Sequence, residues 1–311
     1  RHNFLDGIAY KMLSFNHYTA KAINMNFYSE TAKRIPEFIS LANAIRKTRL
    51  PAGVTGLSHI HKAHVIASMC QCLVKKALVI APDEAQATRL RQDMEIFGIN
   101  AIHFPARDFS FRTMETVSRE YEHARLKVLD KMLTGDFDAV VVSAEAASQL
   151  TVPPSMLMNS SLSVESGEDY DVDELIFNLV RCGYTRSEQV DGPGQFALRG
   201  GILDFYPPDS ALPCRVEFWG DSVDSISLFN PETQRREDTV NEIRITPARE
   251  ILCIDELLCA LIEKHIADKK IKGDALKKLN EDIEALRGGI RLSSLDKYMP
   301  LIYPQSAGIF D

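Results

Sequence analysis

Short apolar runs separated by single helical segments dominate the first half of the chain. Residues 77–80 and 139–142 have the continuous apolar character of strands that are buried on both faces, and residues 101–104 form a third strand candidate. Helical patterns over residues 83–98 and 115–133 lie between them. Strands that alternate with single helices of this length form β-α-β units, so the sequence predicts a parallel sheet.

A glycine-containing loop ahead of these units has the outline of a phosphate-binding loop. The motif G-x-x-x-x-G-K-[ST] wraps phosphates with a second glycine, contacts them with a lysine and holds Mg²⁺ with a hydroxyl. Here Gly53 and Gly56 are followed by Ser58, His59 and Ile60 at those three positions. Isoleucine has no metal-binding atom, and a mostly neutral imidazole replaces a permanent ammonium. We interpret the loop as a degenerate nucleotide loop; a chance Gly-x-x-Gly turn is the alternative.

The segments that would complete a nucleotide-hydrolysing site do not match. A helicase needs paired carboxylates after a strand to hold Mg²⁺ and orient water, whereas residues 143–146 read Ser-Ala-Glu-Ala. Lys62 falls on the first turn of the following helix, which disfavours it as a displaced phosphate ligand. With a glycine loop ahead of its first helix, this half of the chain resembles the nucleotide-binding core of P-loop proteins.

After residue 150 the pattern changes to short strands with tight turns. Gly220-Asp221 is the two-residue signature of a hairpin. Asp83 with Gln86, and Asp171 with Glu174, have capping-box spacing and open one helix in each half. A separate, mainly antiparallel domain is therefore expected, followed by two helical patterns and an apolar segment that returns to the first sheet. The strands are predicted at residues 196–199, 202–206, 215–219, 223–229 and 242–246, the helices at 255–269 and 274–286, and the returning segment at 298–303.

Composition and charge exclude several classes of protein. No apolar run approaches the roughly 18 residues of a membrane span, and no secretory signal opens the chain, so a cytoplasmic location is expected. The six cysteines lie among apolar neighbours without a C-x-x-C pair, as buried free thiols do, and His61 with His64 is interpreted as part of a polar helix face, so no metal site is expected. The net charge of −7 argues against a surface that tracks nucleic acid throughout, although residues 1–50 hold eight Lys/Arg against three Asp/Glu.

Three strings in the second half carry a specific resemblance. They read GQFALRGGILDFYPP at residues 194–208, RVEFWGDSVDSI at 215–226 and FNPETQR at 229–235. They resemble the excision-repair protein UvrB and, more closely, the N-terminal UvrB-like module of bacterial transcription-repair coupling factors (Mfd). The likeness covers about Met25 to Asp311 and implies a fold of the α/β class: a degenerate P-loop, RecA- or helicase-like parallel-sheet domain with an inserted, mainly antiparallel α+β domain, as in UvrB.

The resemblance implies recruitment as the function. In the family the UvrB-like module binds UvrA, which brings nucleotide excision repair to stalled RNA polymerase. Matching the motifs residue by residue makes Arg186, Arg199, Glu217 and Phe218 candidate UvrA contacts. Paired arginines on a strand face offer bidentate donors to carboxylates, and an exposed aromatic beside them would supply a hot spot. The alternative for Arg199 is an exposed cross-strand ion pair worth under about 1 kcal/mol.

The resemblance also implies a division of the chain and of its activities. The expected parts are a variable extension (1–24), the P-loop-like domain (25–150), the UvrA-binding-like domain (151–248) and a helical, returning segment that completes the first domain (249–311). No cofactor is expected here: ATP, Mg²⁺, RNA polymerase and duplex DNA are expected to engage absent motor regions of a protein more than three times as long. The other interpretations are a UvrB-like ATP-dependent repair or helicase fragment, and a DNA-binding module that uses the basic N-terminal region.

Overall fold

The computed structural model describes residues 27–107, 119–290, 292, 295–305 and 307–311. The chain divides into two compact units, each described by itself below. The first runs to Ala106 and includes Gly135–Ala146; the second comprises Arg107–Thr134 and Ala147–Asp311. In the described part of the chain, no helix is long and apolar enough to cross a membrane.

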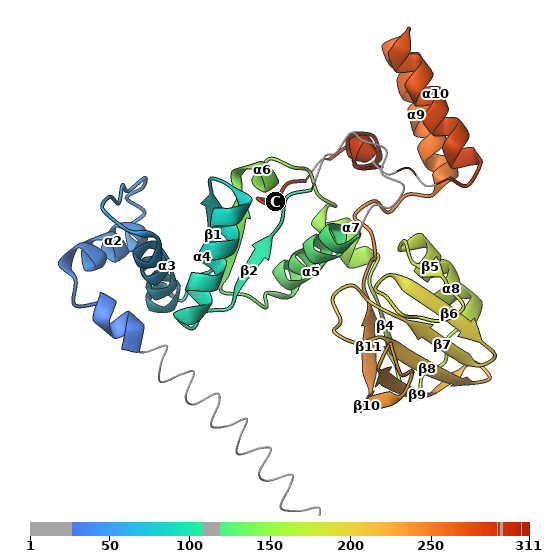
Figure 1. Cartoon of the computed structure of the whole chain (residues 1–311), viewed down its shortest axis with the longest axis horizontal. Helices are drawn as coiled ribbons and strands as arrows, with labels where there is room; N and C mark the ends of the chain where they lie inside the picture. The colour runs from blue at the N-terminus through green and yellow to red at the C-terminus, as the bar shows by residue number, and fades with distance from the viewer. Residues whose placement is uncertain (1–26, 108–118, 291, 293–294, 306) are drawn as a thin grey trace, which may run out of the picture. The chain divides into compact units, whose positions relative to one another are not determined.

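The first unit is built on a three-stranded parallel sheet (Figure 1). The predicted strands are confirmed as β1 (Ala77–Ala81), β2 (Ala101–Phe104) and β3 (Ala139–Ser143), in the order β1-β3-β2. The prediction that residues 77–80 are buried on both faces is wrong, because only Ala77, Val79 and Ala81 pack in the core, whereas Leu78 and Ile80 are exposed on the other face. β3 is the central strand and all five of its residues are buried, which explains its unbroken apolar run. The helices of this unit are α2 (Pro36–Arg46), α3 (His59–Leu73) and α4 (Glu84–Ile96), with the short α6 (Ala144–Ala147) after β3.

Helices α3 and α4 share a core with this sheet. Ala63 and Ala67 of α3 and Leu90 and Met94 of α4 pack in one cluster with Val141 of β3. The predicted cap of α4 is confirmed, because the Asp83 carboxylate accepts a hydrogen bond from the Gln86 backbone N–H at 2.8 Å and another from its side-chain amide at 2.7 Å. These hydrogen bonds lower the pKa of Asp83.

The second unit contains a six-stranded sheet and a separate two-stranded ribbon (Figure 1). The larger sheet has the order β10-β9-β8-β7-β6-β5, antiparallel except for the β5–β6 pair. The ribbon pairs β11 with β4. The strands are β4 (Leu162–Glu165), β5 (Thr185–Arg186), β6 (Gln195–Arg199), β7 (Ile202–Phe205), β8 (Cys214–Trp219), β9 (Ser222–Phe229), β10 (Arg236–Val240) and β11 (Glu242–Ile245).

Helix α8 (Val172–Arg181) begins at the predicted cap and packs on the sheet. The Asp171 carboxylate accepts hydrogen bonds from the N–H groups of Asp173 and Glu174 at 2.9 and 3.2 Å. Leu175 and Leu179 of this helix are buried against one face of the six-stranded sheet. The remaining helices of the unit are α5 (Glu120–Thr134), α7 (Pro154–Asn159), α9 (Asp255–Lys269) and α10 (Asp274–Arg287), and residues 115–118 of the longer helix predicted at α5 lie outside the described residues.

The apolar segment at residues 298–303 is helical. With the preceding residues it forms the 3₁₀ helix η1 (Leu295–Tyr298) and the helix α11 (Met299–Ile302). Pro300 lies in the first turn of α11, where a missing N–H costs nothing. Tyr298 is buried in a cluster with α9 and α10, so the apolar residues of this segment cover the helical pair.

A buried ion pair joins distant segments of the second unit. Arg125 of α5 and Glu250, which follows β11, are 0% and 1% exposed, and their Nε and Oε1 atoms lie 2.5 Å apart. Arg107 forms a second ion pair with Glu250. The Gln149 side-chain oxygen accepts from Arg125 at 3.2 Å, and the Glu122 carboxylate accepts from the Glu250 backbone N–H at 2.9 Å. Burial lowers the pKa of Arg125 and raises that of Glu122.

Candidate partner-binding face

Two of the four candidate contacts, Arg199 and Glu217, lie on one polar face of the six-stranded sheet. Side chains alternate across a strand, so Phe196 and Leu198 of β6 point to the core while Arg199 points to the opposite face. The β6–β7 and β7–β8 registers place Asp204 opposite Ala197 and Arg215, on this same face. The strands therefore bring two arginines and one aspartate from three neighbouring strands together. We call the residues Arg199, Asp204, Arg215, Glu217 and Arg236 the arginine face.

Asp204 is the centre of the arginine face. Its side chain is 1% exposed and accepts from Arg215 in a bidentate manner, from Nε at 2.7 Å and from Nη2 at 2.9 Å. It also accepts from Nη2 of Arg199 at 2.7 Å. The Arg199 side chain is 50% exposed, so one of its nitrogens is held by the aspartate while the rest of the guanidinium faces solvent. The predicted alternative of an ion pair is thus present, and its acidic partner is buried.

Arg215 is held more firmly than Arg199. Its guanidinium carbon lies 4.6 Å from the centre of the Phe229 ring, and the hydrogen bonds to Asp204 raise its pKa. Two arginines around one carboxylate leave a net positive charge on this part of the sheet. A bidentate pair of this kind fixes the plane of a guanidinium, so the geometry of the face is set before a partner arrives.

Glu217 closes the other side of the arginine face. It forms an ion pair with Arg236 of β10 and accepts a hydrogen bond from the Ser225 hydroxyl at 2.9 Å. The Arg236 hydrogen bond lowers the pKa of Glu217. Glu217 lies opposite Ile202 in the register, next to the β6–β7 turn that carries Arg199. The structure therefore brings Arg199 and Glu217 to one surface.

The other two candidate residues lie elsewhere. Phe218 packs against the core of the sheet, so it does not provide the exposed aromatic beside the arginines. Trp219, the next residue, is 85% exposed at the hairpin. Arg186 is exposed on the edge strand β5, but its register with Phe196 places it on the core side of the sheet. Arg199 thus pairs with Arg215 across Asp204, and the paired arginines do not include Arg186.

Sequence reasoning missed Asp204 as the residue that orients both arginines. The available signal was the strand alternation itself, since an aspartate between Leu203 and Phe205 must point away from the apolar face. An ionised carboxylate at a buried position requires cationic partners. Arg199 and Arg215 are the arginines that the two flanking strands supply. The exposure of Trp219 could also have been predicted, because Trp219 directly precedes the predicted turn residues Gly220-Asp221.

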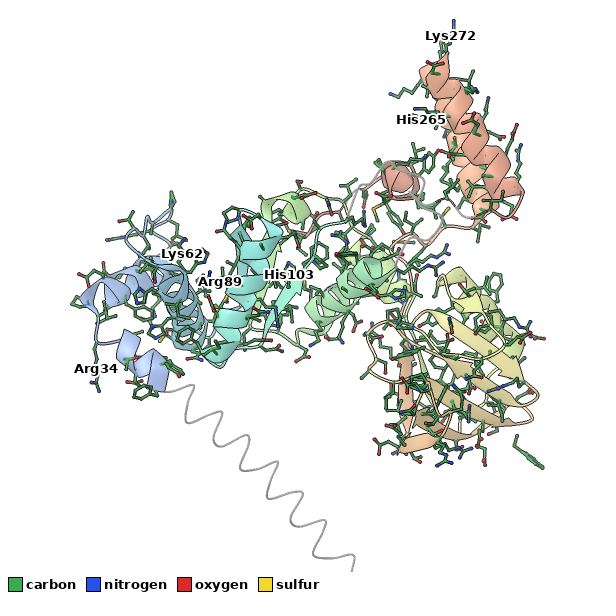
Figure 2. The ribbon with its side chains drawn as sticks, viewed as in Figure 1. Arg34, Lys62, Arg89, His103, His265 and Lys272 are labelled. Carbon is green, nitrogen blue, oxygen red and sulfur yellow. The ribbon has the colours of Figure 1, made fainter. Side chains whose placement is uncertain are left out.

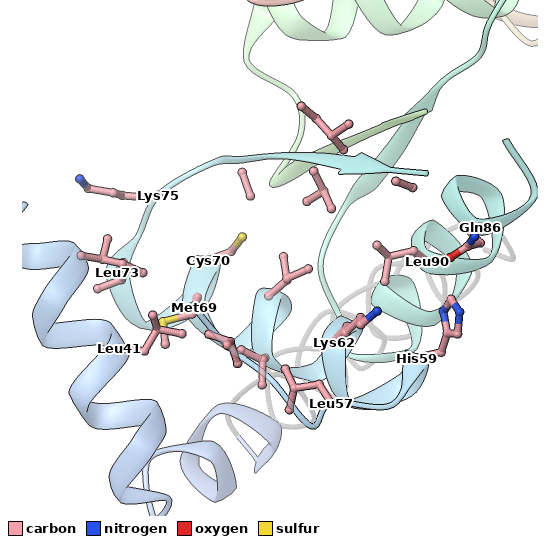
Figure 3. A pocket seen from close by; sticks show the side chains of 18 of the residues that line it. Leu41, Leu57, His59, Lys62, Met69, Cys70, Leu73, Lys75, Gln86 and Leu90 are labelled. Carbon is pink, nitrogen blue, oxygen red and sulfur yellow. The ribbon is translucent and has the colours of Figure 1, made fainter. Parts of the chain in front are cut away.

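The glycine-containing loop at residues 53–60 lies in the first unit, beside an apolar cavity of about 760 Å³ (Figure 3). Gly56 has φ +79°, Ser58 precedes α3 without a side-chain cap, and the Ser58 hydroxyl lies 3.0 Å from Nδ1 of His61. His59 and Lys62 line the cavity with Leu57, whereas Gly53, Ser58 and Ile60 are exposed outside its lining. The wall is mostly aliphatic, which offers few hydrogen bonds to a triphosphate.

The described residues contain no group of three metal-ligating side chains. Within the first unit, His64 lies 3.0 Å from the Tyr28 carbonyl through its Nε2 atom, and Cys70 is buried with its pKa raised to about 11 by burial. The six cysteines are free thiols. The thiolate, not the protonated thiol, binds metals, and a single imidazole without other ligands is a poor metal site.

Comparison with known proteins places the arginine face in a recognised domain. Residues 162–251, which include β4 to β11, match the family model of the UvrB interaction domain. The chain is also similar to transcription-repair-coupling factors over most of its length. It is 28% identical over 291 residues to that of Bacillus subtilis (90% of this chain, 25% of the relative), and 30% identical over 256 residues to that of Myxococcus xanthus (79% and 21%). For the Staphylococcus aureus protein the identity is 32% over 214 residues (68% and 18%).

These matches confirm the resemblance to the UvrB-like module of transcription-repair coupling factors. The chain spans about a quarter or less of the length of the relatives it matches. The fold is a mixed α/β one with a parallel and an antiparallel sheet, and the family match falls on the antiparallel part.

Proposed function

We propose that the chain is a recruitment module that binds UvrA through the arginine face, and that it brings nucleotide excision repair to stalled RNA polymerase as part of a transcription-repair coupling factor. The observation that carries the proposal is the Arg199–Asp204–Arg215 cluster. It lies within the segment that matches a UvrB interaction domain, and it presents a half-exposed guanidinium with a fixed orientation. Arginine in such a setting recognises carboxylates with two parallel hydrogen bonds.

The exposed Trp219 supports the same surface. Interface hot spots are enriched in tryptophan and arginine, and they combine a large apolar side chain with a directed polar one. Trp219 lies at the β8–β9 turn and Arg199 at the β6–β7 turn, and the Phe218 N–H donates a hydrogen bond to the Gly201 carbonyl between these two turns. Arg186, on the core side of the sheet edge, remains a proposed contact at the rim, where a charge changes the association rate more than the affinity.

The module is proposed to act without nucleotide chemistry. Its P-loop is proposed to be degenerate, because Ile60 and His59 supply neither a Mg²⁺ ligand nor a permanent charge and the adjoining cavity is mostly aliphatic. ATP hydrolysis, Mg²⁺, duplex DNA and RNA polymerase are assigned to other parts of the longer protein.

Titration of the purified chain with the cognate UvrA tests this function. The wild-type protein is expected to bind, and Arg199→Glu is expected to abolish binding while its thermal melt stays unchanged. Arg181→Glu is the matched control, because it makes the same charge change at an exposed residue of α8, the helix that packs on the core side of the sheet. Equal binding by Arg199→Glu and wild type would remove the arginine face from the proposal.

An ATP analogue titrated into the same sample tests the rival interpretation. No signal is expected. Nucleotide binding without UvrA binding would reverse the order of the two functions and make the UvrB-like ATPase the better assignment.

A further inference from the structure

The helices α9 and α10 form an antiparallel hairpin whose two ends differ in chemistry (Figure 1). Leu258 and Ile262 of α9 pack with Ile283 and Leu286 of α10 in one apolar cluster with Tyr298. This cluster occupies the end where the hairpin meets η1 and α11. The opposite end is the turn at residues 270–273, which closes through the left-handed Lys270 and the positive-φ Gly273.

Lysines gather around this turn, which we call the hairpin tip. Figure 2 shows Lys272 at the end of the hairpin, with His265 further back along α9. Residues 264–278 contain six lysines against two aspartates, a local charge of +4 in a chain whose net charge is −7. All six side chains are exposed: Lys264, Lys269, Lys270, Lys272, Lys277 and Lys278.

The charge of the hairpin tip is almost unneutralised. Among the described residues, five of the six lysines have no carboxylate partner, and the sixth, Lys277, has only Glu281 at 3.9 Å, one turn along its own helix. Other exposed amines of the chain do have close partners, such as Lys33 with Glu30 at 2.6 Å and Lys297 with Asp282 at 2.5 Å. The six ammonium groups outnumber the two carboxylates of Asp268 and Asp274 and repel one another, so a polyanion that binds there gains from relieving that repulsion.

We propose that the hairpin tip binds the phosphate backbone of duplex DNA, independently of sequence. Lysine contacts phosphates as a point charge, without the planar fork by which arginine recognises a base or a carboxylate. The tip also lacks the anchor that a protein partner requires. In the described chain, no large apolar side chain between Leu257 and Ile290 is exposed, and protein interfaces depend on such anchors. The hairpin tip is therefore cationic and offers no apolar contact, and this combination favours binding to a nucleic-acid backbone.

The size of the hairpin tip sets the expected strength. At 1.5 Å per residue, the six lysines lie within roughly 10 Å of the turn along the helix axes. One strand of B-DNA carries a phosphate every 3.4 Å or so, so a tip of this size faces about three phosphates. Three contacts give a slope of about −2.7 in the logarithm of the association constant against the logarithm of salt concentration. The proposal is separate from UvrA binding, since α9 and α10 follow the segment that matches the interaction domain.

The test measures fluorescence anisotropy of a labelled random-sequence duplex with the whole chain, over about 50 to 200 mM salt. The variant Lys269→Gln/Lys272→Gln/Lys278→Gln removes three charges from the tip without touching a packed residue, and it is expected to lose most of the binding and most of the salt slope. The matched control removes three exposed charges from the basic N-terminal region, by Arg34→Gln, Lys47→Gln and Arg49→Gln, and is expected to bind as the wild type does.

Three results would overturn the assignment. The first is no duplex binding by the wild-type chain at low salt. The second is unchanged binding by the tip variant, with or without loss in the N-terminal control. The third is equal binding of a poly-glutamate peptide of the same charge as the duplex, because the tip would then recognise acidic chains in general. Thermal melts of both variants confirm that the fold is retained.

Discussion

The Asp204 carboxylate is buried, so its charge must be balanced by neighbouring side chains instead of by water. Its charge is balanced by Arg215 with two hydrogen bonds and by Arg199 with one. Removing Asp204 leaves the mostly buried Arg215 without its carboxylate, while the half-exposed Arg199 stays in solvent, so the cost is that of an unsatisfied polar group, about 1–3 kcal/mol. Asp204→Ala is therefore expected to lower the free energy of unfolding by about that amount, measured by urea denaturation, and to weaken UvrA binding because both guanidinium groups lose their orientation.

Arg199→Ala separates the two roles of this cluster. Arg199 is half exposed, and Asp204 keeps its bidentate contact with Arg215 when Arg199 is removed. The loss of a partly exposed ion pair is expected to cost less than about 1 kcal/mol while binding falls. Comparable destabilisation by Arg199→Ala and Asp204→Ala would show that Arg199 is a structural residue.

His123 is expected to make stability depend on pH. It is buried on α5, and its pKa is lowered to about 4, first by desolvation and then by the Arg119 charge. A histidine that is neutral when folded and has a pKa near 6.5 when unfolded binds more protons in the unfolded state, so stability is present above pH 6.5 and is lost as pH falls toward 4. The loss is at most about 1.4 kcal/mol per pH unit in that window. Denaturation at pH 7 and pH 5 measures it, and His123→Asn should flatten the difference; an unchanged pH dependence in the variant would assign the effect to other groups.

At the scale of elements, the turn between β6 and β7 is where the arginine face is most sensitive to substitution. The Gly201 carbonyl accepts a hydrogen bond from the Phe218 N–H at 2.7 Å, and a Cβ at Gly201 would lie 2.9 Å from the Phe218 carbonyl oxygen. Gly201→Ala must therefore push β8 away from the turn, at a cost of about 1–3 kcal/mol by analogy with overpacking. Gly53→Ala, where nothing lies within 4 Å, is the control and should leave the midpoint of urea unfolding in place. A Gly201→Ala protein as stable as the control would contradict this account of the turn.

The elements that sequence patterns predicted are those that bury an apolar face. The three parallel strands, the Gly220 hairpin and the pair of C-terminal helices follow from periodicity and turn chemistry. Strand β10 escaped prediction because four of its five residues are charged or polar and exposed at the sheet edge. Strand β4 is short, and the predicted strand at β11 pairs with it instead of joining the larger sheet. Pairing partners follow from long-range packing, which local patterns do not carry.

The candidate site shows the same division. Arg199 and Glu217 were identified from motif resemblance and lie on one surface, whereas the burial of Asp204 depends on the registers of two strand pairs. Phe218 was a candidate contact because Glu217 and Phe218 match an acidic-aromatic pair in the resemblance to UvrB. Strand alternation places Phe218 on the same side of β8 as Cys214 and Val216, against the core, and Trp219 at the hairpin faces solvent. The motif match carried no information about the side of the strand on which Phe218 lies.

At the scale of the whole molecule, the buried Arg125–Glu250 pair fastens segments that are far apart in the chain. Arg125 and Glu250 are separated by 125 residues, and Gln149, before α7, accepts from the same guanidinium. The antiparallel domain begins and ends between these residues, so the pair ties the chain that leaves that domain to the helix that precedes it. Closing so long a loop costs entropy that only specific contacts at its ends can offset.

This closure predicts that Glu250 contributes to stability far from the binding face. Glu250→Ala removes the carboxylate that lies closest to the buried Arg125 guanidinium and is expected to lower the free energy of unfolding by about 3–5 kcal/mol, measured by urea denaturation. The double variant Arg125→Leu/Glu250→Leu removes both charges and should be more stable than Glu250→Ala, because burying apolar groups of similar volume costs less than burying an unpaired ion. If Glu250→Ala and the double variant lower the free energy of unfolding equally, the stability comes from side-chain packing and not from the charge pair. UvrA binding by the folded double variant should match the wild type, since Asp204 and its arginines do not contact this pair.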